Sequence, residues 1–456
     1  MSPEGCHYNA RLAVVVEPAV NPPVPHIVIV GGGAGGIVLA TLLGRKLGRK
    51  GKANVTLVDA QLTHIWKPLL HEVAAGSLNP YEDELNYFAQ AQRNGFAFQP
   101  GRMIGIDRDA RTIRLDEMQD ESGDTVVETR EIPWDWLIVA IGSTTNDFGT
   151  PGAREHCICL DTRGEAERFH RAMLNCYYRA KARGASGTEL DVAIIGAGAT
   201  GVELSAELHH AAQALARYGL SEIRPTDVRI TLIEAGPRIL PALGERVAIA
   251  ARRHLEEMGV TVLTGDQVTR IDTDGIHTAS GRFVPAQLRV WAAGIKAPDF
   301  LAGIAGLETA RGNTLIVDPL LRTTRDPRIF AIGDCASCTL TLPGGKELRV
   351  PPRAQSAYQQ ALWLADALPR LMTGAEPAPF AYRDHGSLVS LSDEGSVGQL
   401  MGNLMGRVNV EGRIARVMYK SLYRMHQASL YGWVRTLVFM LKDVLGHSTG
   451  PRLKLH

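Results

Sequence analysis

Length, composition and charge place the chain among folded globular proteins. It has 456 residues, which is too long for one typical hydrophobic core and predicts two or three packed domains. Charged residues make up 21% of the chain and the residues AVILMFWYC make up 45%, so collagen-like and disordered classes are excluded. The net charge of +1 gives no reason to expect nucleic acid as a partner.

Residues 1–24 are predicted to be a disordered lead-in. Glu17 and the prolines after it interrupt a short apolar run at 12–16, so no signal-peptide core can form. Six cysteines in so long a chain do not make a disulfide framework, which indicates a reducing compartment. No stretch reaches the ~18 apolar residues of a spanning helix, so any membrane contact is expected at the bilayer surface.

A nucleotide-binding pattern follows the lead-in. Residues 26–30 read as a buried strand and residues 37–43 as a helix, with glycines between them. The glycines of the G-x-G-x-x-G pattern are Gly31, Gly33 and Gly36, and Ala34 follows the second of them. The three glycines would give the tight turn, the approach to a pyrophosphate and close helix packing. The next strand, 55–58, ends at Asp59, whose carboxylate can bind a ribose hydroxyl.

The same pattern occurs a second time. An apolar strand at 190–195 runs into three glycines at the same spacing, Gly196, Gly198 and Gly201. Its second strand, 229–233, ends at Glu234, which can bind a free 2′-hydroxyl and would repel a 2′-phosphate, so NADH is expected rather than NADPH. Two such units indicate two dinucleotides held close together, as electron transfer between flavin and nicotinamide requires. The alternative is that one unit is a relic.

Six further segments carry a resemblance to a known family. Residues 138–143, with Ala140 and Gly142, resemble the "A-T-G" strand of two-dinucleotide flavoproteins, although Ile141 replaces the threonine. Residues 290–294, ending in Gly294, resemble the strand that closes their NADH domain.

Residues 329–334 resemble the second FAD signature of the same proteins, in which the residue at Asp334 binds the ribityl chain. Residues 351–359 contain A-Q-x-A-x-Q, which resembles the quinone-site motif of type II NADH:quinone oxidoreductases. The segments 384–392 and 423–427 are similar to bacterial members.

This resemblance implies an α/β fold of two Rossmann-type domains and a C-terminal amphipathic segment that associates with a membrane. It implies an FAD domain at 25–150 and 297–380, an NADH domain at 151–296 and a membrane-associating region at 381–456. The expected enzyme is a homodimer on the cytoplasmic face of a bacterial inner membrane. It would oxidise NADH through FAD and reduce a membrane quinone, ubiquinone or menaquinone, without pumping protons.

Three polar residues are candidates for the chemistry. Gln355 and Gln359 lie four apart on a helix expected at 354–364, where their amides could bind quinone carbonyls or form an ordinary solvated face. The resemblance places Glu203 close to flavin and nicotinamide, to orient the carboxamide or handle a proton. Its alternative role is a helix N-terminal acid favoured by the helix dipole. No metal site is assigned, and histidines such as His64 and His71 are interpreted as structural or exposed.

The cysteines bear on two rival functions. Residues 60–100 contain no cysteine, which removes the dithiol relay of a disulfide reductase. A sulfide:quinone reductase could use paired cysteines, Cys157 with Cys159 or Cys335 with Cys338, but needs no second nucleotide unit. The C-x-x-C spacing of the latter pair could also hold a metal or form a redox pair, the alternative being small residues packed beside the FAD loop. A nucleotide-sensing flavoprotein scaffold would be expected to lack the quinone motif.

The C-terminal residues change the charge balance. Residues 412–456 contain eight Lys or Arg against the single acid Asp443. If the segment forms a helix, which Gly432 could divide into two, its basic residues lie on one face. They are Arg413, Arg416, Lys420, Arg424, Arg435 and Lys442. The opposite face has Met418, Leu422, Met425, Trp433, Leu437, Met440 and Val444. This pattern is typical of an interfacial anchor in anionic lipid, the alternative being a helix packed on the protein's own core or on a second subunit.

Overall fold

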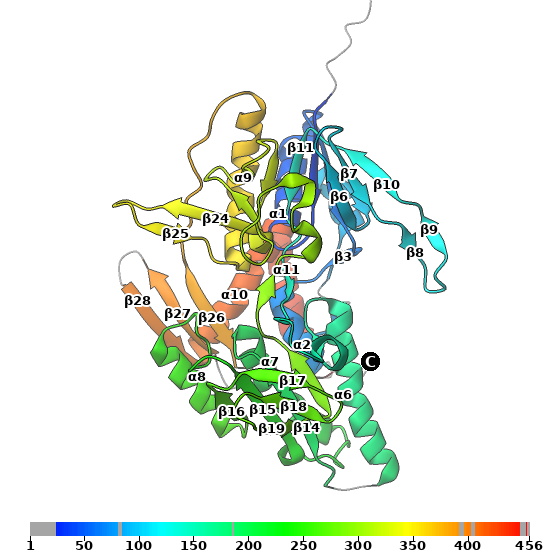
Figure 1. Ribbon diagram of the computed structural model, residues 1–456, viewed down its shortest axis with the longest axis vertical. Coiled ribbons are helices and arrows are strands. Elements are labelled where there is room, and N and C mark those ends of the chain that lie inside the picture. The colour runs from blue at the N-terminus through cyan, green and yellow to red at the C-terminus, as the bar shows by residue number, and fades with distance from the viewer. Residues whose placement is uncertain are drawn as a thin grey trace, which may run out of the picture.

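The computed structural model describes residues 24–80, 84–184, 187–391, 396–402, 406–446 and 453. Two five-stranded parallel sheets with their helices form the upper and lower halves of the molecule (Figure 1). The α/β class with two Rossmann-type units, predicted from the sequence, is confirmed. Residues 1–23 of the predicted lead-in lie outside the described residues.

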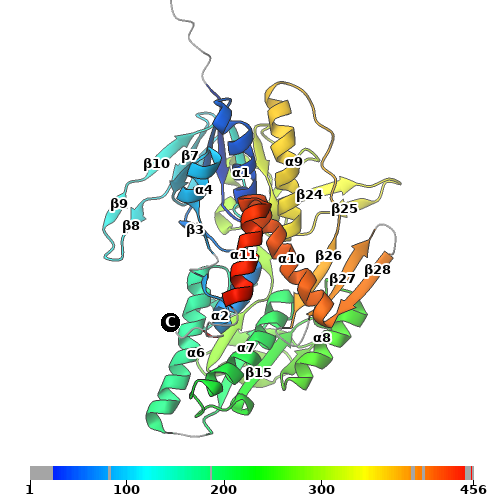
Figure 2. The same ribbon diagram turned by 180° about the vertical axis from the view of Figure 1, so that it is seen from behind.

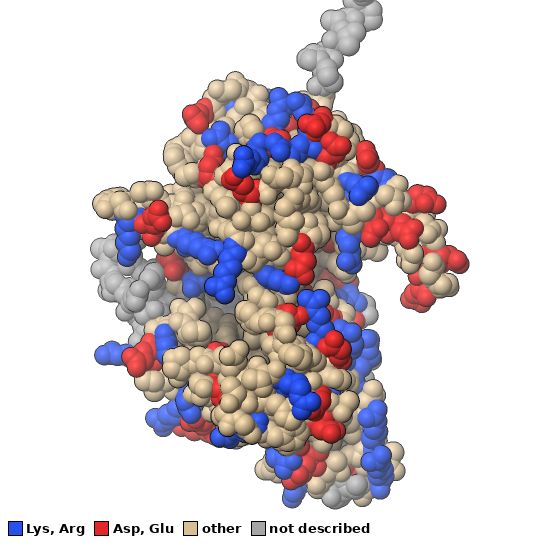
Figure 3. All heavy atoms as spheres, viewed as in Figure 1, with Lys and Arg blue, Asp and Glu red and all other residues tan. Residues whose placement is uncertain are grey.

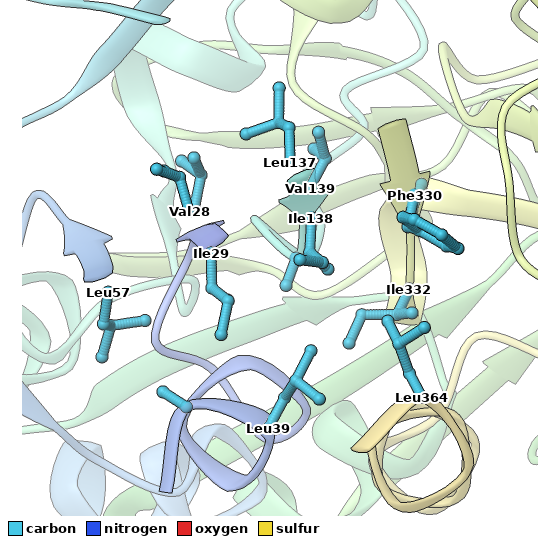
Figure 4. Packing of buried hydrophobic residues seen from close by; sticks show 14 of the residues in the cluster. Val28, Ile29, Leu39, Leu57, Leu137, Ile138, Val139, Phe330, Ile332 and Leu364 are labelled. Atoms are coloured by element: carbon cyan, nitrogen blue, oxygen red, sulfur yellow. The ribbon is translucent and has the colours of Figure 1, made fainter. Parts of the chain in front are cut away.

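The first sheet has the strand order β23-β11-β1-β2-β5, and every neighbouring pair is parallel. Its strands are β1 (His26–Val30), β2 (Asn54–Asp59), β5 (Ala97–Pro100), β11 (Trp136–Val139) and β23 (Ile329–Ala331). The central strands are apolar on both faces, as a sheet covered on both sides requires. Figure 4 shows Ile29 and Ile138 above Leu39 of the helix α1 (Gly36–Lys46), with Leu364 of the helix α9 (Ala354–Met372) below Ile332.

The second sheet repeats this arrangement. Its order is β13-β20-β14-β15-β16, again parallel throughout. Its strands are β13 (Ile158–Cys159), β14 (Leu190–Ile195), β15 (Val228–Glu234), β16 (Thr261–Thr264) and β20 (Leu288–Trp291). In both sheets the strand before the glycine loop is central, so the loop opens at the carboxyl edge of the sheet, where such folds bind ligands.

Helices cover the two sheets. Around the first sheet lie α1 (Gly36–Lys46), α4 (Tyr87–Asn94) and α9 (Ala354–Met372). The second half contains α2 (Leu70–Ala75), α6 (Arg163–Arg183), α7 (Ala199–Arg217) and α8 (Glu245–Glu257). The longest, α6, starts at a capping box of Thr162 and Glu165 and stops at Gly184, which is left-handed.

Short strands join the halves and extend from them. The pair β12 (Thr144–Thr145) and β21 (Ile295–Lys296) is antiparallel and carries the chain between the two halves. The small sheets comprise β6 (Met103–Asp107), β7 (Thr112–Leu115), β10 (Arg130–Pro133), β17 (Val268–Ile271), β18 (Gly275–Thr278), β19 (Phe283–Pro285), β22 (Leu315–Val317), β24 (Ala336–Thr341) and β25 (Glu347–Arg349). Two-stranded ribbons are formed by β3 (Thr63–His64) with β4 (Leu85–Asn86) and by β8 (Met118–Gln119) with β9 (Thr125–Val127).

The C-terminal part begins with an antiparallel sheet of β26 (Gly386–Ser390), β27 (Ser396–Gly402) and β28 (Gly406–Glu411). Two helices follow, α10 (Gly412–Tyr431) and α11 (Trp433–Gly446), and Figure 2 shows them on the back of the molecule near α1 and α9. Gly432 separates them at a φ of +83°, so the division expected there is present. Over the described residues, no helix combines the length and apolar character needed to cross a membrane.

Candidate functional site

The two glycine loops have matching geometry. The N–H of Gly31 donates to Val58 O at 2.7 Å, and the N–H of Gly196 donates to Ile233 O at 2.7 Å. Their φ angles are +101° and +99°, which residues with a side chain rarely adopt. A Cβ on Gly31 would also lie 2.4 Å from Ala140 O. Each loop therefore needs glycine at this position for its own backbone.

The other glycines of the two patterns divide by role. A Cβ on Gly36 would lie 1.8 Å from Gly31 O, and one on Gly201 would lie 2.0 Å from Gly196 O. By contrast, a Cβ on Gly33 or Gly198 would meet nothing within 4 Å. The first and third glycines thus serve the protein's own packing, while the second glycine of each loop faces open space of the kind a pyrophosphate would occupy. Ala34 lies in the turn before α1.

The acids at the ends of β2 and β15 contact these loops in the same way. Asp59 accepts from the N–H of Gly32 at 2.6 Å and from Gln61 at 2.7 Å. Glu234 accepts from the N–H of Ala197 at 2.9 Å and from the residue two positions after it at 2.7 Å. Burial raises the pKa of the Asp59 carboxyl, and the two backbone donors oppose that rise. Both carboxylates are therefore held at the mouth of a glycine loop.

The second FAD signature lies beside the first loop. Asp334, in a short 3₁₀ turn after β23, accepts from Ser143 Oγ at 2.8 Å. The N–H of Gly333 donates to the amide oxygen of buried Gln360 at 2.7 Å, so α9 holds this turn from below. Sequence reasoning missed Gln360, which follows directly after Gln359 and belongs to no pattern that was used.

A hollow opens between the two halves of the molecule (Figure 3). One cavity of about 330 Å³ is lined by Ser143 and Asp334 and by three basic residues, Lys296, Arg311 and Arg349. Gly142, which ends the "A-T-G"-like segment, has a φ of +71°. At Gly294 a Cβ would lie 2.4 Å from the ring of Phe148, so that position needs glycine for packing.

The two glutamines of the quinone motif hold a neighbouring segment. Gln355 donates to Gly386 O at 2.9 Å and accepts from the N–H of His385 at 3.2 Å. Gln359 donates to Arg383 O at 2.8 Å and accepts from its N–H at 3.0 Å. The alternative of a purely solvated helix face is therefore wrong, because both amides bind backbone between Arg383 and Gly386. The helix is also longer than expected and continues to Met372.

Glu203 is buried in the second half. It lies in the second turn of α7, which begins at Ala199, and its Oε1 accepts from the N–H of Ser390 at 3.0 Å. Its Oε2 lies 3.5 Å from Nδ1 of His71. The alternative of a first-turn acid favoured by the helix dipole is wrong, since the side chain is enclosed by α2 and β26.

The cysteine pairs carry no sign of thiolate chemistry. Cys335 is fully buried, donates to the carbonyl of Ile332 at 3.3 Å, and burial raises its pKa to about 12. Burial likewise raises the pKa of Cys338 to about 11 and that of Cys157 to about 12. A reactive cysteine needs the opposite shift. The geometry therefore favours small residues packed beside the FAD turn.

The helix α10 is fixed to the half of the molecule that contains the first sheet. The hydroxyl of Tyr358, on α9, lies 2.7 Å from Ser429 Oγ. His426 stacks on Trp66 with ring centroids 4.0 Å apart, and its Nε2 lies 3.1 Å from Nε2 of His64. Burial lowers the pKa of His64 to about 4, and burial followed by the neighbouring imidazole lowers that of His426 well below its usual value. Both histidines are therefore neutral at pH 7.

The last helix turns apolar side chains outward. On α11 the exposed apolar residues are Trp433, Val434, Leu437, Val438, Met440 and Leu441, while Thr436 is buried. At 100° per residue these six span one continuous arc, bordered on one side by Arg435 and Lys442. The single basic face expected along both helices stays a prediction: Gly432 gives each helix its own orientation, and the structure describes the side chains of Arg424, Arg435 and Lys442 from that face. The side chains of Arg413, Arg416, Lys420, Met418, Leu422 and Val444 lie outside the described residues.

The chain is similar in sequence to known proteins. Residues 25–361 match the sequence model of the pyridine nucleotide-disulphide oxidoreductase family, so fold and paired loops define a protein of that class. The type II NADH:quinone oxidoreductase of Haemophilus influenzae is 42% identical over 447 residues, which cover 94% of this chain and 100% of that protein. Type II NADH:quinone oxidoreductase NdhA of Mycobacterium tuberculosis is 28% identical, covering 89% of this chain and 86% of that protein.

A solved structure supports the same fold. NDH2 from Plasmodium falciparum in complex with NADH superposes with a TM-score of 0.79 at 19% identity, covering 94% of this chain and 100% of that one. The chain belongs to the type II NADH:quinone oxidoreductases. The family predicted from the sequence is confirmed, and it favours this function over the sulfide:quinone reductase and scaffold alternatives.

Proposed function

We propose that the first Rossmann-type unit binds FAD and that the second binds NADH. The observation that carries the proposal is the open space at Gly33 and Gly198, each beside a half-buried strand-end acid. The chain oxidises NADH and reduces a quinone, as its family does. FAD, when bound, supplies the chemistry that links the two substrates. The proposed FAD domain is 25–150 with 297–380, and the proposed NADH domain is 151–296.

The residues of the chain bind and orient these groups. Asp59 and Glu234 would receive the ribose hydroxyls, and Asp334, fixed by Ser143 and by the Gly333 turn, would contact the ribityl chain. Glu203 would lie beside the nicotinamide. Gln355, from the quinone motif on α9, would present its amide to the quinone carbonyl when the segment after Arg383 moves away from it.

The quinone would reach α9 from a membrane. The apolar arc of α11 suits insertion at the level of lipid headgroups, and its two basic residues suit anionic lipid. Because α10 is bonded to α9 through Tyr358 and Ser429 and α11 follows α10, this arc and the quinone motif lie on connected helices. The proposed location is the cytoplasmic face of the cell membrane, where NADH is available, with two copies forming a homodimer.

Release and identification of the cofactor tests this proposal. Purified protein should carry a flavin that denaturation releases as FAD, and anaerobic NADH should bleach its absorption band. The band should return on addition of a quinone. Release of FMN, or of no flavin at all, would contradict the cofactor assignment, while bleaching by NADPH as efficiently as by NADH would contradict the assignment of Glu234.

A further inference from the structure

Three titratable side chains form a line from the buried Glu203 to the surface. His71 and Glu72 are neighbours on α2, which packs against α7, the helix of Glu203. Nδ1 of His71 lies 3.5 Å from Glu203 Oε2, and its Nε2 lies 3.9 Å from Glu72 Oε1. The exposed fractions of the three side chains are 6% for Glu203, 2% for His71 and 24% for Glu72. Only the last therefore reaches solvent appreciably.

The imidazole at the centre of this line is incompletely bonded. Among the described residues, Nε2 of His71 is a buried nitrogen without a hydrogen-bond partner. Buried polar atoms are nearly always bonded, so this one calls for an explanation. Burial lowers the pKa of His71 to about 4, against a smaller opposing effect of the Pro68 carbonyl. At pH 7 the ring is neutral, so one nitrogen carries a proton and the other can accept one.

Other titratable groups near α2 have different positions. Glu207, one turn after Glu203 on α7, accepts from Ser77 Oγ at 3.0 Å. His170, on α6, is buried against Gly76, where a Cβ would lie 2.3 Å from its ring. His71 is the residue whose two ring nitrogens face a carboxylate on each side.

The reaction consumes one proton from solvent, because NADH, a proton and a quinone give NAD⁺ and a quinol. We propose that His71 passes this proton from Glu72 to Glu203. When Glu203 has given its proton to the reacting centre, the imidazole transfers the Nδ1 proton to the Glu203 carboxylate and takes a proton from Glu72 on Nε2. Ring tautomerisation resets the imidazole, and solvent reprotonates Glu72. The inference rests on the proposed place of Glu203 beside the reacting groups.

Stopped-flow measurement of the separate half-reactions tests the relay. In His71→Ala, reduction of the holoenzyme by NADH should proceed as in the wild type. Reoxidation by a short-chain benzoquinone should slow on the order of tenfold or more, as loss of a proton-transfer group does. A pH-indicator dye in weak buffer should show proton uptake delayed to the same extent, and added imidazole should restore both rates. His170→Gln, which changes another buried histidine beside α2, should leave all of them unaltered.

A structural role for His71 would give a different pattern. Wild-type quinone reduction and proton uptake in His71→Ala would overturn the relay, as would equal slowing of both half-reactions in a variant of unchanged melting temperature. Glu203→Gln separates the two proposals. If this variant reduces quinone at the wild-type rate, the proposed place of Glu203 is wrong. If it reduces quinone slowly while His71→Ala does so at the wild-type rate, only the relay is refuted. In cofactor-free protein, ¹⁵N NMR should show a shift of His71 Nδ1 in Glu203→Gln, and an unchanged signal contradicts their contact.

Discussion

Glu203 and Gln355 are held by the two ends of one strand. The N–H of Ser390 donates to Glu203, and the carbonyl of Gly386 accepts from Gln355. Four residues of extended chain, roughly 13 Å, separate these two attachment points. β26 therefore links the residue proposed to lie beside the nicotinamide with the first glutamine of the quinone motif, although they are 152 positions apart by subtraction, 355 − 203.

Tryptophan at the second glycine of each loop should remove one nucleotide at a time. Gly33→Trp should yield colourless protein, because the indole fills the open space proposed for the FAD pyrophosphate. Gly198→Trp should keep its flavin colour and lose reduction by NADH. Absorption spectra before and after anaerobic NADH measure both. Full flavin content in Gly33→Trp would contradict the first assignment, and normal bleaching of Gly198→Trp the second.

The preference for NADH should depend on Glu234. Its removal in Glu234→Ala takes away the charge that repels a 2′-phosphate and the acceptor for a 2′-hydroxyl. The ratio of kcat/KM for NADH over NADPH should fall by about tenfold or more, which corresponds to ~1.4 kcal/mol. Initial rates with both nucleotides give the ratio. A wild-type enzyme that used both equally well would already refute the assignment.

Gln355→Leu should slow quinone reduction on the order of tenfold, the contribution of about one hydrogen bond in a buried site. Flavin reduction by NADH should remain nearly intact, because the two half-reactions use separate sites. Trp363→Phe is the matched control, since it also removes one bond from α9 to a backbone carbonyl, that of Ala378. Equal loss of both half-reactions in Gln355→Leu would show damage to the fold rather than to a quinone site.

Charges on the apolar arc of α11 should release the protein from lipid. Leu437→Glu with Leu441→Glu removes two exposed leucines, each contributing ~1.5 kcal/mol or more when buried in a bilayer. The affinity for anionic vesicles, measured by co-sedimentation, should fall by about a hundredfold. Activity on long-chain quinones should be reduced more than activity on short soluble ones. Ile249→Glu on α8, another exposed apolar residue, is the control and should bind normally. Undiminished binding by the double variant would place the membrane contact elsewhere.

The buried pair of His64 and His426 should make stability depend on pH. Unfolded histidine takes up a proton below about pH 6.5, whereas folded His64 does so only near pH 4. The unfolded state thus binds more protons in this window, so stability is full above pH 6.5 and falls as the pH falls toward 4. For His64 alone the loss is ~3 kcal/mol.

Melting temperatures between pH 7 and pH 5 check this expectation. His64→Asn should show a smaller decline over that range than the wild type, even where its melting temperature at pH 7 is lower. His385→Asn alters an exposed histidine and should decline as the wild type does. Identical slopes in all three proteins would contradict a neutral buried pair.

The two nucleotide units could be predicted because their determinants are local. The glycines, the strand before them and the acid after them lie within short stretches of sequence. The first and third glycines are dictated by backbone sterics, as the contact of a Gly36 Cβ with Gly31 O illustrates. A parallel arrangement of the strands also follows from strands that alternate with helices.

The rest depends on contacts between distant segments. Glu203 contacts His71 and Ser390, which lie 132 and 187 positions away in the sequence. Nothing near Glu203 in the sequence indicates these partners. Gln360 could not be distinguished from Gln359 by helical spacing alone. Helical spacing predicted the apolar side with Trp433, Leu437 and Met440, but the orientation of α11 relative to α10 depends on the left-handed backbone of Gly432 and could not be predicted from that spacing.

Anaerobic turnover of the purified holoprotein with NADH and a short-chain quinone tests the central claim most directly. NADH consumed and quinol formed, followed in the same cuvette, should rise together in a one-to-one ratio over many turnovers. Without quinone, the reaction should stop once the flavin has bleached. Without NADH, the flavin should stay unbleached. Consumption of NADH that ends with flavin bleaching although quinone is present would contradict the assignment of the chain as an NADH:quinone oxidoreductase.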